Sequence, residues 1–199
     1  MSQLGGCSAE ERRLERRRRL LTASVSVFAR SGFRGATVEA VCTEAGLTER
    51  CFFESFQDSE ALLLALHRET SKRIIDAILE VKADLVVGAQ QEVQEMLRRF
   101  FDFFFTHPTE ARLFVAEAVY IGADAHAVCK KWRSTLGGIL AETINPDGYC
   151  PGGMLPAAVA RALLSIAIDW MEDGFARPCH EVVSAGMAMV TTLKPGRGY

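Results

Sequence analysis

The sequence has few residues of the types that build catalytic or metal centres. Only 4 of its 199 residues are histidine. No HExxH or Glu-x-x-His arrangement occurs, so neither a zinc protease nor a di-iron helical bundle is indicated. No G-x-S-x-G occurs, and the paired glycines are not followed by phosphate-loop residues. We therefore expect no catalytic residues, no cofactor and no metal, with an uncharacterised enzyme left open as an alternative.

Paired cysteines and export signals are also missing. The six cysteines form no CxxC pair, which argues against zinc-ribbon and thioredoxin sites. The segment Leu4–Cys7 mimics a lipoprotein cleavage site, but no charged region and no long apolar run precede it. The most apolar stretch, Leu155–Met171, contains Arg161 and Asp169 and is short for a membrane span. We expect a cytoplasmic protein with reduced thiols and no membrane partner.

An excess of charge of one sign is absent overall but present locally. The chain has 23 basic and 25 acidic residues, a net charge of −2. From Arg12 to Arg50 it carries nine arginines, no lysine and four glutamates, a net charge of +5. This distribution fits contact with phosphates at one end of the protein. For the run Arg16–Arg19, the alternative is a solvated helix face paired with Glu11 and Glu15.

Two short helices joined by a glycine are predicted between Thr37 and Phe56. Thr37 and Thr48 are suitable N-caps, and Gly46 can take the positive φ that ends the first helix. Apolar residues recur at helical spacing on both helices: Val38, Val41, Ala45, Phe52 and Phe56. This is the build of a helix-turn-helix, whose second helix enters the DNA major groove. A purely structural helix pair is the alternative.

Three segments in the first third of the chain resemble a known family. They are VFARSGF, GATVEAVCTEAGLTERCFFESF and DSEALLLAL, and their order and spacing are similar to those of the DNA-binding domain of the TetR family of bacterial transcription regulators. The matching positions are Phe28, Gly32, Phe33, Thr37, Val38, Ala45, Gly46, Phe53 and Phe56. The resemblance runs from Arg16 to about Leu66.

The resemblance implies an all-α protein with two domains. A helix-turn-helix DNA-binding domain would occupy residues 8–57, and a ligand-binding and dimerisation domain residues 58–194. Its function would be that of a ligand-responsive repressor that binds a palindromic site on double-stranded DNA as a homodimer. A small apolar or amphipathic effector would release it. A helical adaptor that binds protein is the alternative.

The candidate DNA-binding residues follow from their positions. They are Thr37, Thr48, Glu49, Arg50, Phe53, Arg34 and Arg17. Arg50 can bind guanine through two hydrogen bonds, and Glu49 can accept one from cytosine N4. Relatives often carry Lys at Glu49, a small residue at Arg50, Tyr at Phe53 and His at Glu54. We therefore expect affinity to depend more than usual on the arginines.

The rest of the chain also reads as helical, and no convincing strand appears. Ser8 and Glu11 form a capping box that opens a first helix, which we expect to stop at Ser31-Gly32. A long helix is predicted over 59–86, as a lever between the two domains. Further helices are expected over 90–106, 108–121, 125–144, 156–173 and 178–194, which makes about nine in all.

Aromatic residues gather in the second domain and indicate a ligand pocket, because such pockets are largely apolar. The candidate lining residues are Phe101, Phe104, Tyr120, Trp132 and Trp170. The alternative is ordinary core packing. The last two predicted helices are apolar nearly all round, which favours burial against a second subunit, although core packing in a monomer stays open.

Overall fold

The computed structural model describes residues 8–84, 88–116 and 123–195, and this part of the chain contains nine helices and no strand. The helices are α1 (Ala9–Gly35), α2 (Val38–Ala45), α3 (Glu49–Phe53), α4 (Ser59–Asp84), α5 (Ala89–Thr106), α6 (Pro108–Ala116), α7 (Ala123–Ile144), α8 (Leu155–Glu172) and α9 (Cys179–Thr191). The predicted all-α fold is confirmed.

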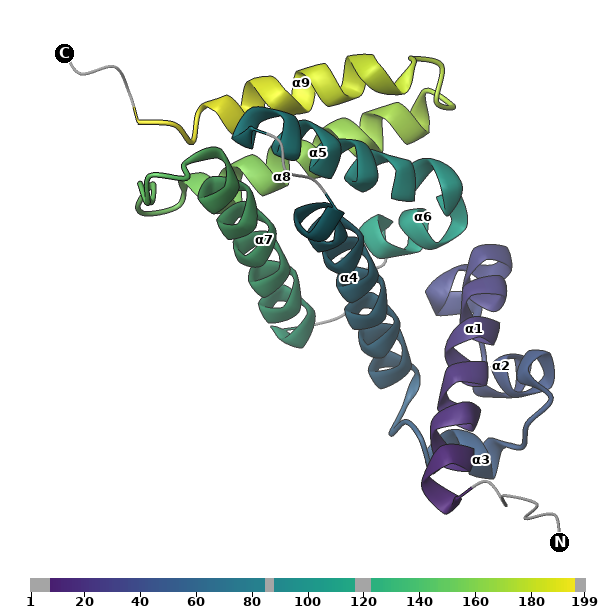
Figure 1. Ribbon diagram of the computed structural model, residues 1–199. Helices are drawn as coiled ribbons and strands as arrows, with labels where there is room; N and C mark the ends of the chain where they lie inside the picture. Colours follow the sequence, from purple (N-terminus) through teal and green to yellow (C-terminus); the bar gives the residue numbers. More distant parts are fainter. Residues whose placement is uncertain (1–7, 85–87, 117–122, 196–199) are drawn as a thin grey trace, which may run out of the picture.

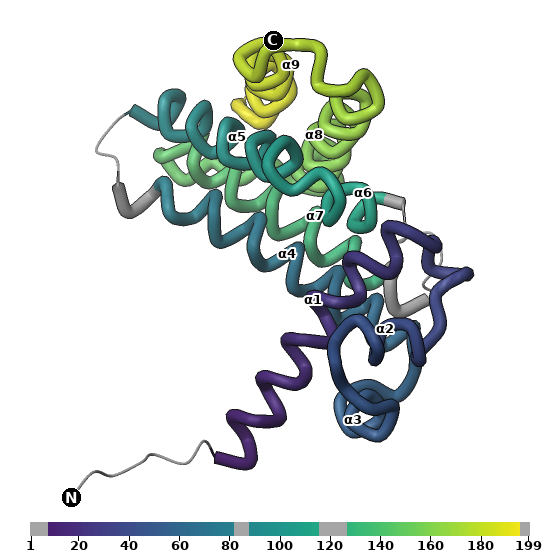
Figure 2. The backbone as a smooth tube through the Cα atoms, turned by 90° about the vertical axis from the view of Figure 1, so that its right-hand side faces the viewer, coloured from purple at the N-terminus to yellow at the C-terminus, as the bar shows by residue number. Residues whose placement is uncertain are grey.

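The helices form an elongated molecule with a small head and a larger body (Figure 1). The head consists of α1, α2 and α3, and the body of α5 to α9. Helix α4 runs from the head into the body. After a quarter turn, the head still lies at one end and α8 and α9 at the other (Figure 2). A change in the body must therefore travel along the molecule to reach the head.

Local sequence explains how the first helix begins and bends. Ser8 and Glu11 form the predicted capping box, in which the Ser8 hydroxyl accepts a hydrogen bond from the Glu11 amide. The predicted end at Ser31-Gly32 coincides with a break in the helical backbone at Gly32, where a kink leads into a short further helical segment. Gly32 has a φ of 66° and a ψ of 165°, and the helix continues to Gly35. Because glycine lacks a Cβ, it adopts this conformation at little steric cost.

Two hydrophobic clusters build the core, and α4 belongs to both. Leu62, Leu63 and Leu66 pack with the buried side chains of α1, α2 and α3. About two to three turns after Leu66, Ile74 and Ile78 pack with the phenylalanines of α5. A single continuous helix thus connects the core of the head to the core of the body.

Helix α6 makes a second connection between head and body. Leu113 of α6 is 8% exposed and belongs to the cluster of the head. One turn earlier in α6, Glu110 forms an ion pair with Arg73 of α4. The Arg73 guanidinium also lies 5.4 Å from the ring centre of Phe103. Helices α4 and α6 therefore both connect the head to the body.

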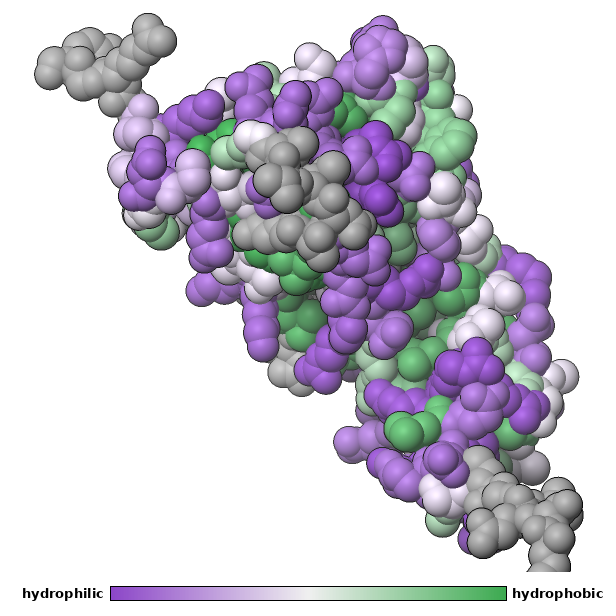
Figure 3. Space-filling view, viewed as in Figure 1, coloured by the Kyte–Doolittle hydropathy of each residue, from purple (hydrophilic) through white to green (hydrophobic). Residues whose placement is uncertain are grey.

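The surface is mainly hydrophilic on the face that Figure 3 displays, with hydrophobic patches between the polar side chains. No described helix combines the length and the apolar composition needed to cross a bilayer.

Candidate nucleic-acid interface

The helix pair α2–α3 has the capping geometry that the sequence predicted. The Thr37 hydroxyl accepts a hydrogen bond from the Ala40 amide at 3.1 Å, and the Thr48 hydroxyl accepts one from the Cys51 amide at 3.5 Å. Gly46 ends α2 in the left-handed conformation, with a φ of 61°. The chain then turns sharply into α3, as in a helix-turn-helix.

The inner side of this pair is packed against the head. Phe52 is fully buried, and Phe56 and Val41 are 4% and 2% exposed. Phe52 contacts Phe53 edge to face, with ring centres 5.4 Å apart. This packing fixes the orientation of α3, which at five residues is too short to hold its conformation alone.

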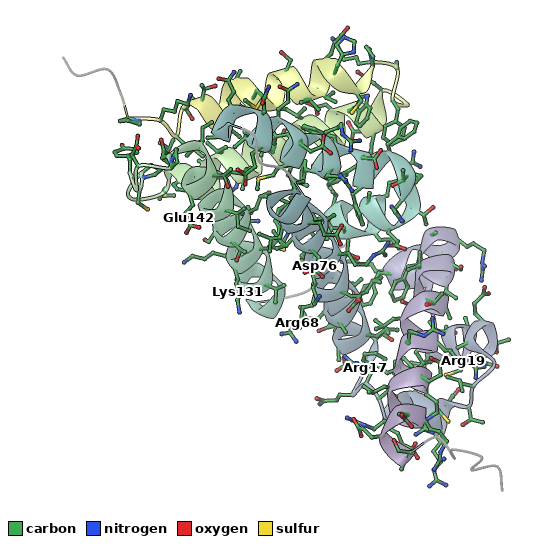
Figure 4. The ribbon with its side chains drawn as sticks, viewed as in Figure 1. Arg17, Arg19, Arg68, Asp76, Lys131 and Glu142 are labelled. Atoms are coloured by element: carbon green, nitrogen blue, oxygen red, sulfur yellow. The ribbon has the colours of Figure 1, made fainter. Side chains whose placement is uncertain are left out.

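Two arginines of α1 attach the helix pair to the first helix. Arg19 Nη2 donates to the Ala45 carbonyl at 2.6 Å and to the Gly46 carbonyl at 3.2 Å. Arg17 Nη1 donates to the Ser55 carbonyl at 2.8 Å, and its guanidinium lies 4.2 Å from the Phe56 ring centre. Figure 4 labels both arginines. The last carbonyls of a helix lack partners within it, so these side chains satisfy groups that would otherwise need water.

Burial is the largest influence on the pKa of Arg17. It lowers the pKa of the guanidinium, and the positive charges of Arg13 and Arg68 lower it further. Arg17 was predicted as a phosphate contact, and one of its nitrogens is engaged within the protein. Sequence reasoning missed this structural use, because nothing local in the arginine run distinguishes inward from outward side chains.

Other arginines of α1 pair with neighbouring glutamates at the surface. Arg13 pairs with Glu10 and Arg18 with Glu15, at 2.9 and 2.8 Å. The hydrogen bonds from these guanidinium groups lower the pKa of both carboxyl groups. Such exposed pairs exchange readily for other partners, because each contributes little to stability.

The outer side of α3 is open to solvent. The Arg50 side chain is 88% exposed and Phe53 is 57% exposed. Thr48, Glu49 and Thr37 are exposed as well. Arg34, the remaining candidate, is exposed in the last turn of α1. The predicted reading side chains of α3 therefore share one accessible surface.

Glu54 links Arg50 to the first helix. Arg50 Nε donates to Glu54 Oε1 at 3.1 Å. Arg16 Nη2 lies 3.6 Å from Glu54 Oε2. The hydrogen bond from Arg50 to Glu54 uses Nε. Both terminal nitrogens of the guanidinium are therefore without a partner among the described residues. A guanidinium held in this way can offer two parallel N–H groups to the O6 and N7 atoms of guanine.

The candidate ligand-binding residues do not line one cavity. Phe101 and Phe104 are fully buried and Trp170 is 4% exposed, all within the core of the body. Trp132 is 5% exposed and lines a cleft of about 740 Å³ between α4 and α7. Tyr120 lies outside the described residues. The part of the chain that the structure describes contains no group of three His, Cys, Asp or Glu able to hold a metal ion.

A helix pair whose second helix is open to solvent, followed by a long helix that enters a helical body, is the arrangement of a helix-turn-helix domain joined to a second helical domain. The family model for bacterial regulatory proteins of the tetR family matches residues 20–66. The matched residues comprise most of the head and the start of α4, so this part of the chain is similar to the DNA-binding domain of that family.

Curated relatives match this chain over only about half of its length. The transcriptional repressor NicS of Pseudomonas putida is 25% identical over 106 residues, which cover 53% of this chain and 50% of the relative. The repressor AcnR of Corynebacterium diphtheriae is 35% identical over 96 residues, covering 42% and 50%. The matches thus span about half the length of these relatives.

Solved structures match over nearly the whole chain. The fatty acid degradation regulator FadR of Bacillus halodurans has a TM-score of 0.74 at 17% identity, covering 92% of this chain and 97% of that one. FadR of Bacillus subtilis, solved with stearoyl-CoA, has a TM-score of 0.69 at 17% identity, covering 91% and 99%. At these identities the likeness shows the fold.

Proposed function

We propose that the protein is a repressor that binds a palindromic DNA operator as a homodimer and leaves it when a small molecule binds the body. The carrying observation is the open outer side of α3, with Arg50 88% exposed on a helix whose inner side is buried. A side chain placed in this way can enter the major groove without any rearrangement of the head.

In this proposal the residues of the interface have different tasks. Arg50 binds guanine and Glu49 accepts from cytosine, while Thr37, Thr48 and Phe53 contact the backbone or bases beside them. Arg34 adds charge at the edge of the interface. Arg17 and Arg19 contribute by keeping α2 and α3 seated on α1, through the carbonyl contacts described above.

The surface of α8 and α9 supports the homodimer. These helices contribute Leu163, Val182 and Val190 to the core of the body. Their other sides carry small or flexible exposed residues: Ala158, Ala185, Ala188 and Met189. Small residues permit close helix packing, so a second copy can complete a four-helix bundle. Two heads on such a dimer would reach successive major-groove turns, roughly 34 Å apart.

The continuity of α4 supports the response to a ligand. Because the same helix packs in both cores, a ligand that shifts it in the body changes the spacing of the two heads. The effect is limited by the ligand's preference for one spacing over the other. The stearoyl-CoA bound to FadR of Bacillus subtilis is a further reason to expect a small-molecule effector.

Selection from a random DNA duplex pool, followed by mobility shift, tests DNA binding. The selected site should be a palindrome whose half-sites lie about one helical turn apart. Arg50→Ala should weaken binding to it by about 1–3 kcal/mol and relax the preference at one base pair per half-site.

Lys130→Gln is the matched control, because it also removes one exposed positive charge, but from α7 in the body. It should bind like the wild type. No selected sequence, or an Arg50→Ala variant with unchanged affinity and preference, would contradict the proposal. A monomer by light scattering at micromolar concentration would contradict the homodimer.

A further inference from the structure

The cleft between α4 and α7 has the size of a small-molecule site. Its volume is about 740 Å³, within the range of roughly 300–1,000 Å³ that is typical of such sites. One wall belongs to α4 and the other to α7. The described lining residues are Arg68, Ser71, Lys72, Ile75, Ala127, Val128, Lys131, Trp132 and Thr135.

The charged lining is all of one sign. Arg68, Lys72 and Lys131 contribute to it, and no carboxylate does among the described lining residues. Lys72 is already paired with Asp76 on its own helix. Arg68 and Lys131 have no ion pair with any described residue, and they belong to the two walls, Arg68 to α4 and Lys131 to α7 (Figure 4). An anion between them would neutralise two charges at once.

Trp132 places an unsatisfied donor in the same lining. Its side chain is 5% exposed and packs edge to face on Phe114, with ring centres 5.2 Å apart. Its Nε1–H is buried and has no acceptor among the described residues. The other tryptophan differs, because Trp170 Nε1 donates to the Arg177 carbonyl at 2.8 Å. A buried donor without an acceptor is costly, so an oxygen atom of a ligand would improve the site.

The remaining lining is apolar. Ile75 and Val128 are half-buried on the two walls and line the same cleft as Trp132. Hydrophobic surface is visible between α4 and α7 in the space-filling view (Figure 3). This surface would cover an alkyl chain or ring, while the cations hold the charged end of the same molecule.

We propose that this cleft binds an amphipathic anion. Arg68 and Lys131 bind its carboxylate or phosphate group, Trp132 Nε1–H donates to one of its oxygens, and Ile75 and Val128 cover its apolar part. This inference names the chemical class of the effector in the proposed function. Only its consequence for DNA binding rests on that proposed function; ligand binding itself does not. Binding would connect α7 to α4, the helix that also packs in the head.

Titration calorimetry on the full chain, without DNA, tests the chemical class of the ligand. The probes are decanoate, decyl phosphate, decanol and decylammonium, each below its micelle concentration. Both anions should bind at least tenfold more tightly than the alcohol and the ammonium, because those lack the negative charge. The tighter of the two anions then identifies a carboxylate or a phosphate ligand.

Variants test the location. A double variant, Arg68→Gln with Lys131→Gln, should lose at least tenfold in affinity for the anions and leave decanol binding unchanged. Trp132→Phe should weaken anion binding while it keeps the aromatic ring. Lys130→Gln is the control, because Lys130 is an exposed neighbour on α7 outside the described lining.

Three results would overturn the proposal: no binding of either anion at millimolar concentration, equal binding of all four probes, or a double variant that binds the anions as the control does. The proposed DNA function fails separately, since it is judged by selection and mobility shift in the absence of these probes.

Discussion

The head and the body use the same residue types in opposite ways. In the head, the side chains that would act are on the outside, as Phe53 and Arg50 illustrate, and the core holds their helix in place. In the body, most of the described aromatic side chains are inside, and Phe101 and Phe104 are fully buried, although Phe105 and Tyr149 are exposed. Substitutions in the head should therefore change binding with little change in stability, and those in the core of the body should do the reverse.

The largest expected effect contrasts two phenylalanines. Phe104→Ala should destabilise the protein by about 3–5 kcal/mol, because it removes a fully buried ring that packs on Phe100 and leaves a cavity. Phe53→Ala should change the free energy of unfolding by less than about 1 kcal/mol, since its ring is 57% exposed. Urea denaturation followed by circular dichroism measures both.

Equal losses of stability in these two variants would break the contrast between head and body. A Phe104→Ala variant as stable as the wild type would return Phe104 to the ligand-lining candidates, because a lining side chain faces a cavity rather than the core.

The next largest effect is a pH dependence of the free energy of unfolding, which arises from His67 where α4 packs against the body. Burial, and then the charge of Arg133, lower the pKa of His67 to about 4. The His67 ring stacks on Phe114, and its two nitrogens lie 3.4 Å from Ser71 Oγ and from Cys129 Sγ. Burial and the nearby positive charge therefore favour the neutral form of the imidazole ring in the folded protein.

The sign follows from proton binding. Between about pH 6.5 and 4 the unfolded chain binds a proton at this histidine and the folded protein does not. Stability is therefore complete above about pH 6.5 and falls as the pH decreases toward 4, by up to about 3 kcal/mol. Urea denaturation across this window should show the loss. His67→Gln should flatten it, whereas His180→Gln, at an exposed site, should not. An unchanged slope in His67→Gln would exclude the burial argument.

A smaller effect separates two adjacent glycines of α7. A Cβ on Gly137 would lie 2.1 Å from the Pro156 carbonyl oxygen, so Gly137→Ala forces α7 and α8 apart. We expect a loss of about 1–3 kcal/mol in unfolding free energy. A Cβ on Gly138 meets nothing within 4 Å. Gly138→Ala should stabilise by about 0.5–1 kcal/mol through helix propensity. Thermal melting of both variants measures the difference, and equal shifts would mean that α8 does not press on Gly137.

The sequence predicts the head well because its signals are local. The capping box at Ser8, the N-caps Thr37 and Thr48, and the left-handed Gly46 each act within three or four residues. Such features require no knowledge of distant partners. The predicted stop at Ser31-Gly32 coincides with the kink at Gly32, but the sequence did not indicate the short helical segment that follows it to Gly35.

The body was predicted as helical, but among the described residues that line its cleft only Trp132 was a candidate from the sequence. Phe104 and Trp132 both belong to the core cluster of the body, yet only Trp132 also lines the cleft. Which side of a helix faces a cleft depends on packing between helices far apart in the chain. The cations of the cleft carry no local signal either, because exposed Arg and Lys residues occur on most helices.

The smallest expected effect concerns how the head discriminates between DNA sequences. Glu54→Gln keeps the size of the side chain and removes the charge that holds Arg50 Nε and faces Arg16. Arg50 should then sample more orientations, and the preference for its base pair should fall by about fivefold, or roughly 1 kcal/mol. Non-specific binding should become stronger, because one negative charge near the phosphates is lost. Competition mobility shifts at fixed salt, with the selected operator and a duplex changed at that base pair, measure both quantities.

The body offers a matched control for this charge removal. Arg177 and Glu181 form the same pair, four residues apart, on the way into α9. Glu181→Gln should leave the preference ratio unchanged, since this pair lies far from the head. If Glu54→Gln left the ratio unchanged as well, Glu54 would be a surface charge like any other. A fall in the ratio together with stronger non-specific binding would show that the negative charge of Glu54 orients Arg50, because loss of affinity alone would lower both quantities.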